Sequence, residues 1–176
     1  MQNRPNWLPA HALTDLTTDP LHSSWLKERG SLTARLRETW GTVSVELIEE
    51  GLSTPLPHEA ERLGLPDGEP AWVRCVCLRA GGCARLYART VISAWGPLNP
   101  WAQVQRLGQQ PLGELLFRMP DLQRSAFEWC GDAAWPSPSP SKPDTPWLAR
   151  RCVFRRQGVP LLLTEVFLDL ETDAST

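Results

Sequence analysis

VPLLLTEVFL, residues 159–168, is a nearly continuous apolar segment that contains one carboxylate, Glu165. Successive side chains of a strand point to opposite faces, so Leu163, Glu165 and Phe167 lie on one face. An ionised glutamate in an apolar layer costs several kcal/mol unless a cation or hydrogen bonds compensate it. We therefore expect this chain to need Glu165, either for an internal ion pair or for chemistry.

A second apolar segment, PAWVRCVCL at residues 70–78, carries the complementary charge. In an extended strand Arg74 shares a face with Trp72, Val76 and Leu78. One anion and one cation on two apolar strands predict a pocket with polarised walls. The alternative is a structural ion pair between Arg74 and Glu165, because buried pairs often only satisfy each other.

The composition is typical of a soluble globular protein with a single domain. The chain has 176 residues, of which 41% are hydrophobic and 22% are charged, and this length allows a sizeable core. A net charge of −2 argues against nucleic acid as the main partner, because phosphate binding needs a basic face. The basic residues that do cluster, Arg150, Arg151, Arg155 and Arg156, are expected on the wet side and edge of a strand.

The sequence carries no clear targeting, membrane or metal-binding signal. Residues 1–13 lack the apolar stretch of a signal peptide, and no segment approaches the roughly 20 apolar residues of a membrane helix. Five cysteines, an odd number, are expected to be reduced thiols of a cytoplasmic protein. A metal site at Cys75, Cys77 and Cys83 is the alternative, but their spacing lacks the paired knuckles of structural zinc sites. Buried apolar cysteine is therefore the favoured interpretation.

Periodicity and turn residues predict one antiparallel sheet with helices over it. Helices are expected at 21–27, 32–39, 59–63, 97–107 and 114–119, and strands at 43–47, 70–78, 85–93, 147–156 and 159–170. Ser31 is the expected N-cap of the second helix, and Gly41 its end. Glycines at 81–82 and 158 are expected to close two hairpins. Short antiparallel strands with helices in separate runs indicate the α+β class.

Two segments of this single domain, residues 1–176, are expected to lack regular structure. Residues 1–19 are polar and contain proline, which predicts a loosely tied arm. Residues 131–146 hold five prolines among serines, which predicts a loop.

Few residues outside the two charged strands are candidates for chemistry. The sequence contains no Gly-rich phosphate loop and no G-x-S-x-G, H-E-x-x-H or Cys–His motif. Arg89, in YARTV at residues 87–91, is by itself most simply a surface residue whose stem packs on apolar neighbours. A site built from arginines and a carboxylate suits a small anionic substrate whose reaction needs orientation and proton handling.

Seven short segments occur in the order and spacing of a known family. They are WL at 25–26 with GSLTARL at 30–36, VSV at 43–45 with EG at 50–51, WVR at 72–74, ARTV at 88–91, LG at 107–108 through PLG at 111–113 to LF at 116–117, ARR at 149–151, and PLLLTEVFL at 160–168. Together they resemble the chorismate pyruvate-lyase family. The resemblance covers about residues 25–169.

The resemblance implies roles for five residues. Arg74 falls where the family's arginine grips the ring carboxylate of the product, 4-hydroxybenzoate. Glu165 falls where the family's glutamate meets the 4-hydroxyl end. Leu32 and Leu112 occupy positions that contact the ligand through the main chain, and Arg89 matches an arginine near the second carboxylate.

The resemblance also implies an activity and an architecture. The activity is elimination of pyruvate from chorismate to give 4-hydroxybenzoate, at the start of ubiquinone synthesis. The implied enzyme is a cytoplasmic monomer that uses no cofactor or metal and has no nucleic-acid or membrane partner. The implied fold is a six-stranded antiparallel sheet with a buried ligand, covered here by helical flaps around 20–39 and 99–119.

The rival interpretation is a non-catalytic domain that binds a small aromatic acid. The effector-binding domains of a group of bacterial transcription regulators share the implied fold and bind ligands without catalysis. Such regulators carry an N-terminal winged helix-turn-helix, and only about 20 residues precede the resembling part of this chain. We therefore expect the lyase.

Overall fold

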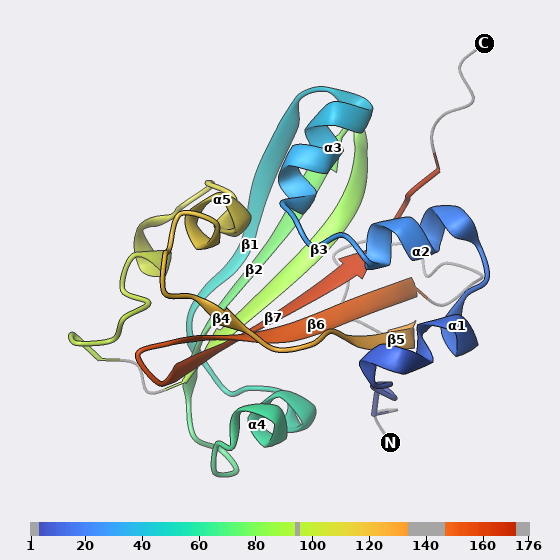
Figure 1. The fold of residues 1–176 in the computed structure, drawn as a ribbon. Coiled ribbons are helices and arrows are strands. Elements are labelled where there is room, and N and C mark those ends of the chain that lie inside the picture. Colours follow the sequence, from blue (N-terminus) through green and yellow to red (C-terminus); the bar gives the residue numbers. More distant parts are fainter. Residues whose placement is uncertain (1–3, 94–95, 134–146, 172–176) are drawn as a thin grey trace.

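Seven antiparallel strands form a single sheet in the computed structural model, which describes residues 4–93, 96–133 and 147–171 (Figure 1). The order across the sheet is β1-β2-β3-β7-β6-β4, and β5 also pairs with β6. The strands are β1 (Val43–Ser53), β2 (Ala71–Ala80), β3 (Cys83–Ile92), β4 (Gln123–Arg124), β5 (Glu128–Ala133), β6 (Trp147–Arg156) and β7 (Val159–Phe167). This confirms the α+β class with one antiparallel sheet.

Helices cover both faces of the sheet. They are α1 (Leu13–Leu16), α2 (Pro20–Leu26), α3 (Leu32–Trp40), α4 (Pro57–Leu63) and α5 (Leu112–Leu116), with short 3-10 helices at Ala10–Ala12 and Val104–Arg106. One face, here called the inner face, carries α2, α3 and α5 over a large apolar cluster that includes Trp25, Leu36 and Trp101. The outer face carries α4 over a smaller cluster that includes Val73 and Leu162.

Local sequence signals explain where α3 begins and ends. Ser31 precedes the helix, and its Oγ accepts a hydrogen bond from the backbone N–H of Ala34 at 3.2 Å, as an N-cap should. Gly41 ends the helix with φ of 83°, a conformation that favours glycine. The predicted cap and stop are both confirmed.

The turn between β6 and β7 fixes the register of the two strands. Gln157 and Gly158 have φ of 49° and 80°, the left-handed pair that a two-residue hairpin turn of the favoured type requires. Pairing then runs back from this turn, so that Cys152 lies opposite Leu163 and Arg150 lies opposite Glu165.

Several expectations about the elements were wrong in detail. The stretch 97–107 forms turns and one 3-10 helix rather than a long helix, and α5 is shorter and begins earlier than expected. Strands β4 and β5 were not expected, so the sheet has seven strands rather than six. Residues 131–133 of the expected proline-rich loop belong to β5, and residues 134–146 lie outside the described residues.

The N-terminal segment is attached to the sheet more closely than a loose arm would be. Leu8 and Trp129 exchange two backbone hydrogen bonds, at 2.7 and 2.9 Å. Ala12 and Leu13 are buried, and the Trp129 Nε1 donates to the carbonyl oxygen of Ala10 at 3.0 Å. Apolar residues within this polar-looking stretch therefore anchor it to β5.

The cysteines are free thiols, as expected. Cys75, Cys77, Cys130 and Cys152 are buried and Cys83 is partly exposed. Burial raises the pKa of Cys130 and of Cys152 to about 12 each, with the charge of Glu165 adding to the rise at Cys152. Both thiols therefore stay protonated near neutral pH.

Candidate active site

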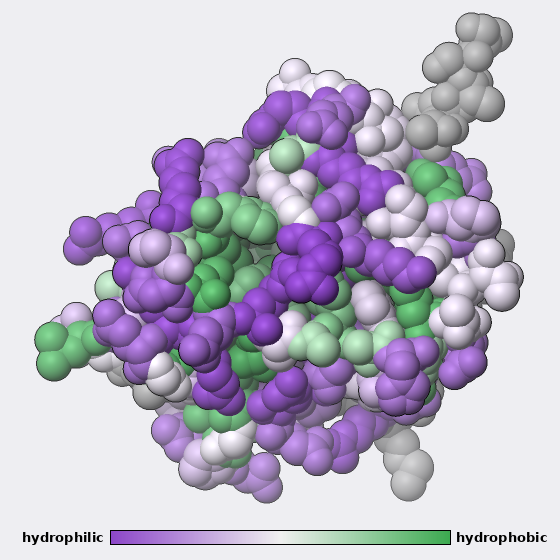
Figure 2. Space-filling view, viewed as in Figure 1, coloured by the Kyte–Doolittle hydropathy of each residue, from purple (hydrophilic) through white to green (hydrophobic). Residues whose placement is uncertain are grey.

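A pocket lies between the inner face of the sheet and the segments that contain α3 and α5. Its floor is apolar and comes from four central strands, with Val76, Leu78, Leu86, Ala88, Thr90, Cys152, Phe154 and Leu163. Leu32, Pro111, Leu112, Leu116 and Phe117 cover it. Figure 2 shows this region as a hollow lined by apolar residues and bordered by hydrophilic ones. Four charged residues also line the pocket: Arg74, Arg124, Arg150 and Glu165.

Arg74 is a buried cation that the described part of the protein does not pair with a carboxylate. It projects from β2 and is 1% exposed. Its Nη2 donates to the carbonyl oxygens of Gly108 and Gln110, both at 2.9 Å, and its Nε has no partner among the described residues. Burial lowers the pKa of Arg74, with the charge of Glu50 partly opposing this. Arg74 lines the apolar pocket, and a desolvated guanidinium without a matching carboxylate among the described residues is a binding site for an anion.

Glu165 is held by a cation on the neighbouring strand. The Nε of Arg150 donates to the Oε2 of Glu165 at 2.7 Å, and both side chains are almost fully buried. The Oε1 of Glu165 receives no hydrogen bond from any described residue. One oxygen is therefore fixed by Arg150, and the other remains available at the pocket wall.

Arg150 also ties Glu165 to the segment that precedes α3. Its Nη1 donates to the carbonyl oxygens of Leu26, at 2.9 Å, and Glu28. The guanidinium lies 4.4 Å from the ring centroid of Phe127, a favourable cation–π distance. The guanidinium of Arg150 is thus held by two carbonyl oxygens and by the ring of Phe127. We therefore regard Arg150 as a positioning residue for Glu165.

The structural ion pair between Arg74 and Glu165 is not formed. Arg74 pairs with Thr90 on β3, and Thr90 pairs with Leu163 on β7, two residues before Glu165. The two charged residues are thus separated by about 10 Å across the sheet and about 7 Å along the strand. Both line the same pocket, which agrees with the predicted pocket with polarised walls and not with the alternative of an ion pair.

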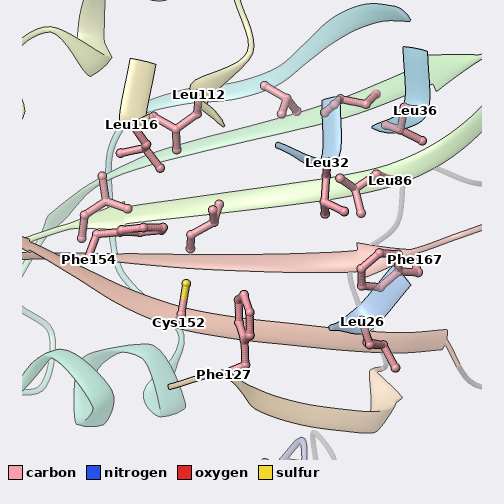
Figure 3. Packing of buried hydrophobic residues seen from close by; sticks show 14 of the residues in the cluster. Leu26, Leu32, Leu36, Leu86, Leu112, Leu116, Phe127, Cys152, Phe154 and Phe167 are labelled. Atoms are coloured by element: carbon pink, nitrogen blue, oxygen red, sulfur yellow. The ribbon is translucent and has the colours of Figure 1, made fainter. Parts of the chain in front are cut away.

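Leu32 and Leu112, for which the resemblance implies main-chain contact with the ligand, both line the pocket. Each is the first residue of its helix, α3 or α5, and each is buried. Figure 3 shows Leu32, Leu112 and Leu116 pointing from the two helices toward the strands. The first N–H groups of a helix have no partner within the helix, so the backbone at these positions is free to contact a ligand.

Arg89 does not belong to this pocket. It alternates with Ala88 and Thr90, which line the pocket, and therefore points to the outer face. There its Nε and Nη2 donate to the two carboxylate oxygens of Glu59, at 2.8 and 3.1 Å. Burial alone would lower the pKa of Arg89, but the hydrogen bonds and charge of Glu59 raise it. Arg89 is thus a buried member of a structural ion pair, neither a surface residue nor part of the site.

Two arginines of the pocket were missed by the sequence analysis. Arg150 was expected on the wet side of its strand, yet it is 3% exposed. The two-residue turn at 157–158 contains the signal, because counting back from it places Arg150 opposite Glu165. Arg151 does not line the pocket. It was likewise expected on the wet side of the strand, but it is buried on the outer face and pairs with Glu128 at 3.0 Å. Arg124 had no signal, since β4 is only two residues long.

The described residues contain no cluster of three or more histidine, cysteine, aspartate or glutamate side chains that could hold a metal ion. In the same part of the chain, no helix has the length and apolar character needed to cross a membrane.

Comparison with known proteins identifies the family. The model of the chorismate lyase family matches residues 1–173. The chain belongs to the chorismate lyase family. A "Probable chorismate pyruvate-lyase" of Hydrogenovibrio crunogenus is 36% identical over 172 residues, covering 96% of this chain and 93% of the relative. Relatives with the same name from Thiobacillus denitrificans and Halorhodospira halophila are each 38% identical, covering 92% of this chain and 88% of the relative.

Among solved structures, this chorismate lyase family member resembles ligand-binding domains of transcription regulators. The effector domain of PhnF from Mycobacterium smegmatis aligns with a TM-score of 0.54 at 16% identity, covering 78% of this chain and 88% of that domain. A GntR-family regulator from Bacillus cereus aligns with a TM-score of 0.53 at 11% identity, covering 76% and 96%. At such low identity the likeness concerns the fold alone. It agrees with the expectation that such effector domains share the fold of the chorismate lyase family.

Proposed function

We propose that the protein is a chorismate pyruvate-lyase that converts chorismate into 4-hydroxybenzoate and pyruvate. One observation carries this proposal. Across an apolar pocket lie a guanidinium with no carboxylate partner and a carboxylate with one oxygen that accepts no hydrogen bond, both judged among the described residues. A flat ring with an acid group at one end and a hydroxyl or ether at the other fits such a pocket. Family membership and the names of the relatives support the same reaction.

Arg74 orients the ring in this proposal. The pocket side of its guanidinium receives the ring carboxylate in a charge-assisted contact. The carbonyl oxygens of Gly108 and Gln110 fix the guanidinium from behind. The backbone at Leu32 and Leu112 contacts the ring from above.

Glu165 acts at the other end of the ring, where the bonds change. The C4–H bond of chorismate breaks, and its electron pair forms a ring double bond. The C3–O bond breaks, and the side chain leaves with that electron pair as enolpyruvate. Protonation of the enolpyruvate methylene carbon then gives pyruvate. The free Oε1 of Glu165 handles the proton at this end, while Arg150 holds Oε2 in place.

The reaction itself provides the driving force. The ring becomes aromatic, no electrons enter or leave, and no group is transferred to a carrier. The chain's own residues therefore only need to orient the dianion and move a proton. We expect a monomeric, cytoplasmic enzyme that needs neither a metal nor an organic cofactor and that catalyses the first step of ubiquinone synthesis.

Enclosure of the pocket should retain the product. Segments containing α3 and α5 meet above it, and Arg37 of α3 lies 3.2 Å from Glu114 of α5. The side chains of Leu32 and Leu112 close the space between these helices and the sheet. A bound ring leaves only when the two helices separate, so slow product release and inhibition by 4-hydroxybenzoate are expected.

The test is incubation of the purified protein, after exhaustive treatment with a chelator, with chorismate. We expect 4-hydroxybenzoate and pyruvate to appear in equal amounts and with many turnovers per protein. Activity that disappears with the chelator and returns with a metal ion would overturn the cofactor-free mechanism. Binding of 4-hydroxybenzoate without turnover would instead support the rival, a carrier or sensor domain.

A further inference from the structure

Arg124 is the one charged residue of the pocket to which the proposed reaction has given no role. It lies on β4 opposite Phe154 of β6, and residues opposite each other on antiparallel strands point to the same face. Its Nη1 donates to the carbonyl oxygen of Arg29 at 3.0 Å. Its guanidinium lies 5.0 Å from the ring centroid of Phe127. Arg124 therefore spans the rim of the pocket, from the sheet edge to the segment before α3.

The cation of Arg124 has no matching anion in the described part of the protein. No described carboxylate lies within ion-pair distance of it, and its Nε and Nη2 have no hydrogen-bond partner among the described residues. It is half-buried, and burial lowers the pKa of Arg124 while the nearby charge of Glu165 partly opposes this. Partial burial of a guanidinium without a partner costs desolvation free energy. An anion bound to Arg124 would compensate this cost.

The charges of the pocket match a dianion. Three arginines and one glutamate line it, and Arg150 is already matched by Glu165. Within residues 4–93, 96–133 and 147–171, two guanidinium groups of the pocket, those of Arg74 and Arg124, remain unmatched. They lie at different ends, because Arg74 projects from β2 whereas Arg124 lies beyond β6, on the side of Glu165 and Cys152.

We propose that Arg124 binds the carboxylate of the enolpyruvyl group and thereby distinguishes the dianionic substrate from the monoanionic product. This inference rests on the proposed lyase function. Chorismate bears its enolpyruvyl ether at C3, next to C4, and its ring carboxylate at C1, across the ring from C4. With the ring carboxylate on Arg74 and C4 beside Glu165, the second carboxylate falls at the end of the pocket where Arg124 stands.

Arg124 takes the place that the resemblance gave to Arg89. Arg89 is on the outer face and is paired with Glu59, so it cannot reach this carboxylate. Arg124 also connects the substrate to the covering segment through its contact with Arg29. When the C3–O bond breaks, the anion on Arg124 leaves as pyruvate, and the ring acid on Arg74 stays behind.

The test compares Arg124→Gln with Arg155→Gln. Arg155 lies opposite Gln123, the neighbour of Arg124 in β4, is exposed and does not line the pocket, so its variant loses the same charge nearby. Arg124→Gln should raise the KM for chorismate by about tenfold or more, as loss of a charge-assisted contact does. Its affinity for 4-hydroxybenzoate, measured by calorimetry, should stay close to that of the wild type. Arg155→Gln should change neither, and Arg124→Lys should recover part of the KM.

Three results would overturn the proposal. They are an unchanged KM in folded Arg124→Gln, an equal loss of affinity for chorismate and for 4-hydroxybenzoate, and an effect of Arg155→Gln as large as that of Arg124→Gln. If the wild type shows no turnover, the lyase function fails by itself. Chorismate binding by the same three variants then decides the role of Arg124, and absence of chorismate binding by the wild type overturns both.

Discussion

Arg74 and Glu165 differ in how their neighbours match their charges. Among the described residues, the hydrogen bonds of Arg74 go only to neutral carbonyl oxygens, so its charge remains to be matched by a ligand. Glu165 is matched on one oxygen by Arg150, so it stays in place without losing its second oxygen. A direct ion pair between Arg74 and Glu165 would have used both charges and left neither for a substrate.

Replacement of Arg74 tests the anion site. Arg74→Ala should abolish useful turnover and weaken 4-hydroxybenzoate binding by about 2–5 kcal/mol, because a desolvated carboxylate loses its cation. Arg74→Lys keeps a positive charge but loses the planar fork, so it should fall between the wild type and alanine. Calorimetry on folded protein measures the affinity. Unchanged affinity in Arg74→Ala would remove Arg74 from the site.

Strand parity was sufficient to predict which face carries these two residues, but not what they contact. Arg74 and Glu165 lie on the inner face with the neighbours that alternation assigns. The partner of Glu165 depends on the register of the β6–β7 hairpin, which strand parity alone does not give. Arg89 was assigned by its resemblance to a family position, although its parity with Tyr87 and Val91 already pointed to the other face.

At the scale of elements, α3 is both part of the core and the cover of the pocket. Leu36 is 1% exposed and packs one turn after Leu32. Leu36→Ala should therefore lower the free energy of unfolding by about 2–5 kcal/mol, through lost burial and a cavity. Leu98→Ala removes the same atoms from a side chain that is 95% exposed and should change it by less than about 0.5 kcal/mol. Urea denaturation measures both. Equal effects would show that α3 does not pack as described.

The N-terminal turn of α4 carries a pH-sensitive residue on the outer face. Burial lowers the pKa of His58, the charge of Glu59 partly opposes this, and the charge of Arg151 adds to it. The unfolded chain binds a proton at His58 below a pH of about 6.5, whereas the folded chain does so only at lower pH. Neutral His58 therefore contributes fully to the stability of the fold above a pH of about 6.5. This contribution is lost as the pH falls toward the lowered pKa of His58.

Thermal unfolding at several pH values tests this assignment. The Tm of the wild type should fall between pH 7 and pH 5, and His58→Asn should show a smaller fall. His11→Asn, which changes an exposed histidine, should follow the wild type. A His58→Asn profile parallel to that of the wild type would show that other groups cause the acid sensitivity.

Long periodic elements could be predicted from the sequence, and short ones could not. The alternation of β1, β2, β3, β6 and β7 and the cap of α3 were recognised, because each extends over many residues or has a specific signal. β4 and β5 exist because β6 offers them backbone partners on its free edge, and two to six residues carry little periodicity of their own. The stretch 97–107 contains prolines that permit turns as well as a helix, and tertiary contacts of Trp101 and Val104 with the core selected the turns.

At the scale of the whole molecule, the two faces of the sheet differ in whether their buried arginines have carboxylate partners. On the outer face buried arginines are matched, Arg89 by Glu59 and Arg151 by Glu128. Burial alone would raise the pKa of Glu128, but hydrogen bonds from Arg62 and Arg151 lower it. On the inner face Arg74 and Arg124 have no matching carboxylate in the part of the chain that the structure describes, and both line an apolar pocket. One sheet thus separates a face held by ion pairs from a face prepared for an anionic ligand.

The most direct test of the role of Glu165 is chorismate turnover by two matched variants, Glu165→Gln and Glu59→Gln. Each removes one buried carboxylate that is bound to an arginine, Glu165 on the inner face and Glu59 on the outer face. Each is compared only where circular dichroism shows an intact fold, because both leave a buried cation behind. Folded Glu165→Gln should lose turnover by about a hundredfold or more, the usual contribution of a proton-transfer group, with a smaller loss of product affinity. Folded Glu59→Gln should keep turnover close to that of the wild type. Wild-type turnover in folded Glu165→Gln, or an equal loss in both variants, would contradict the account.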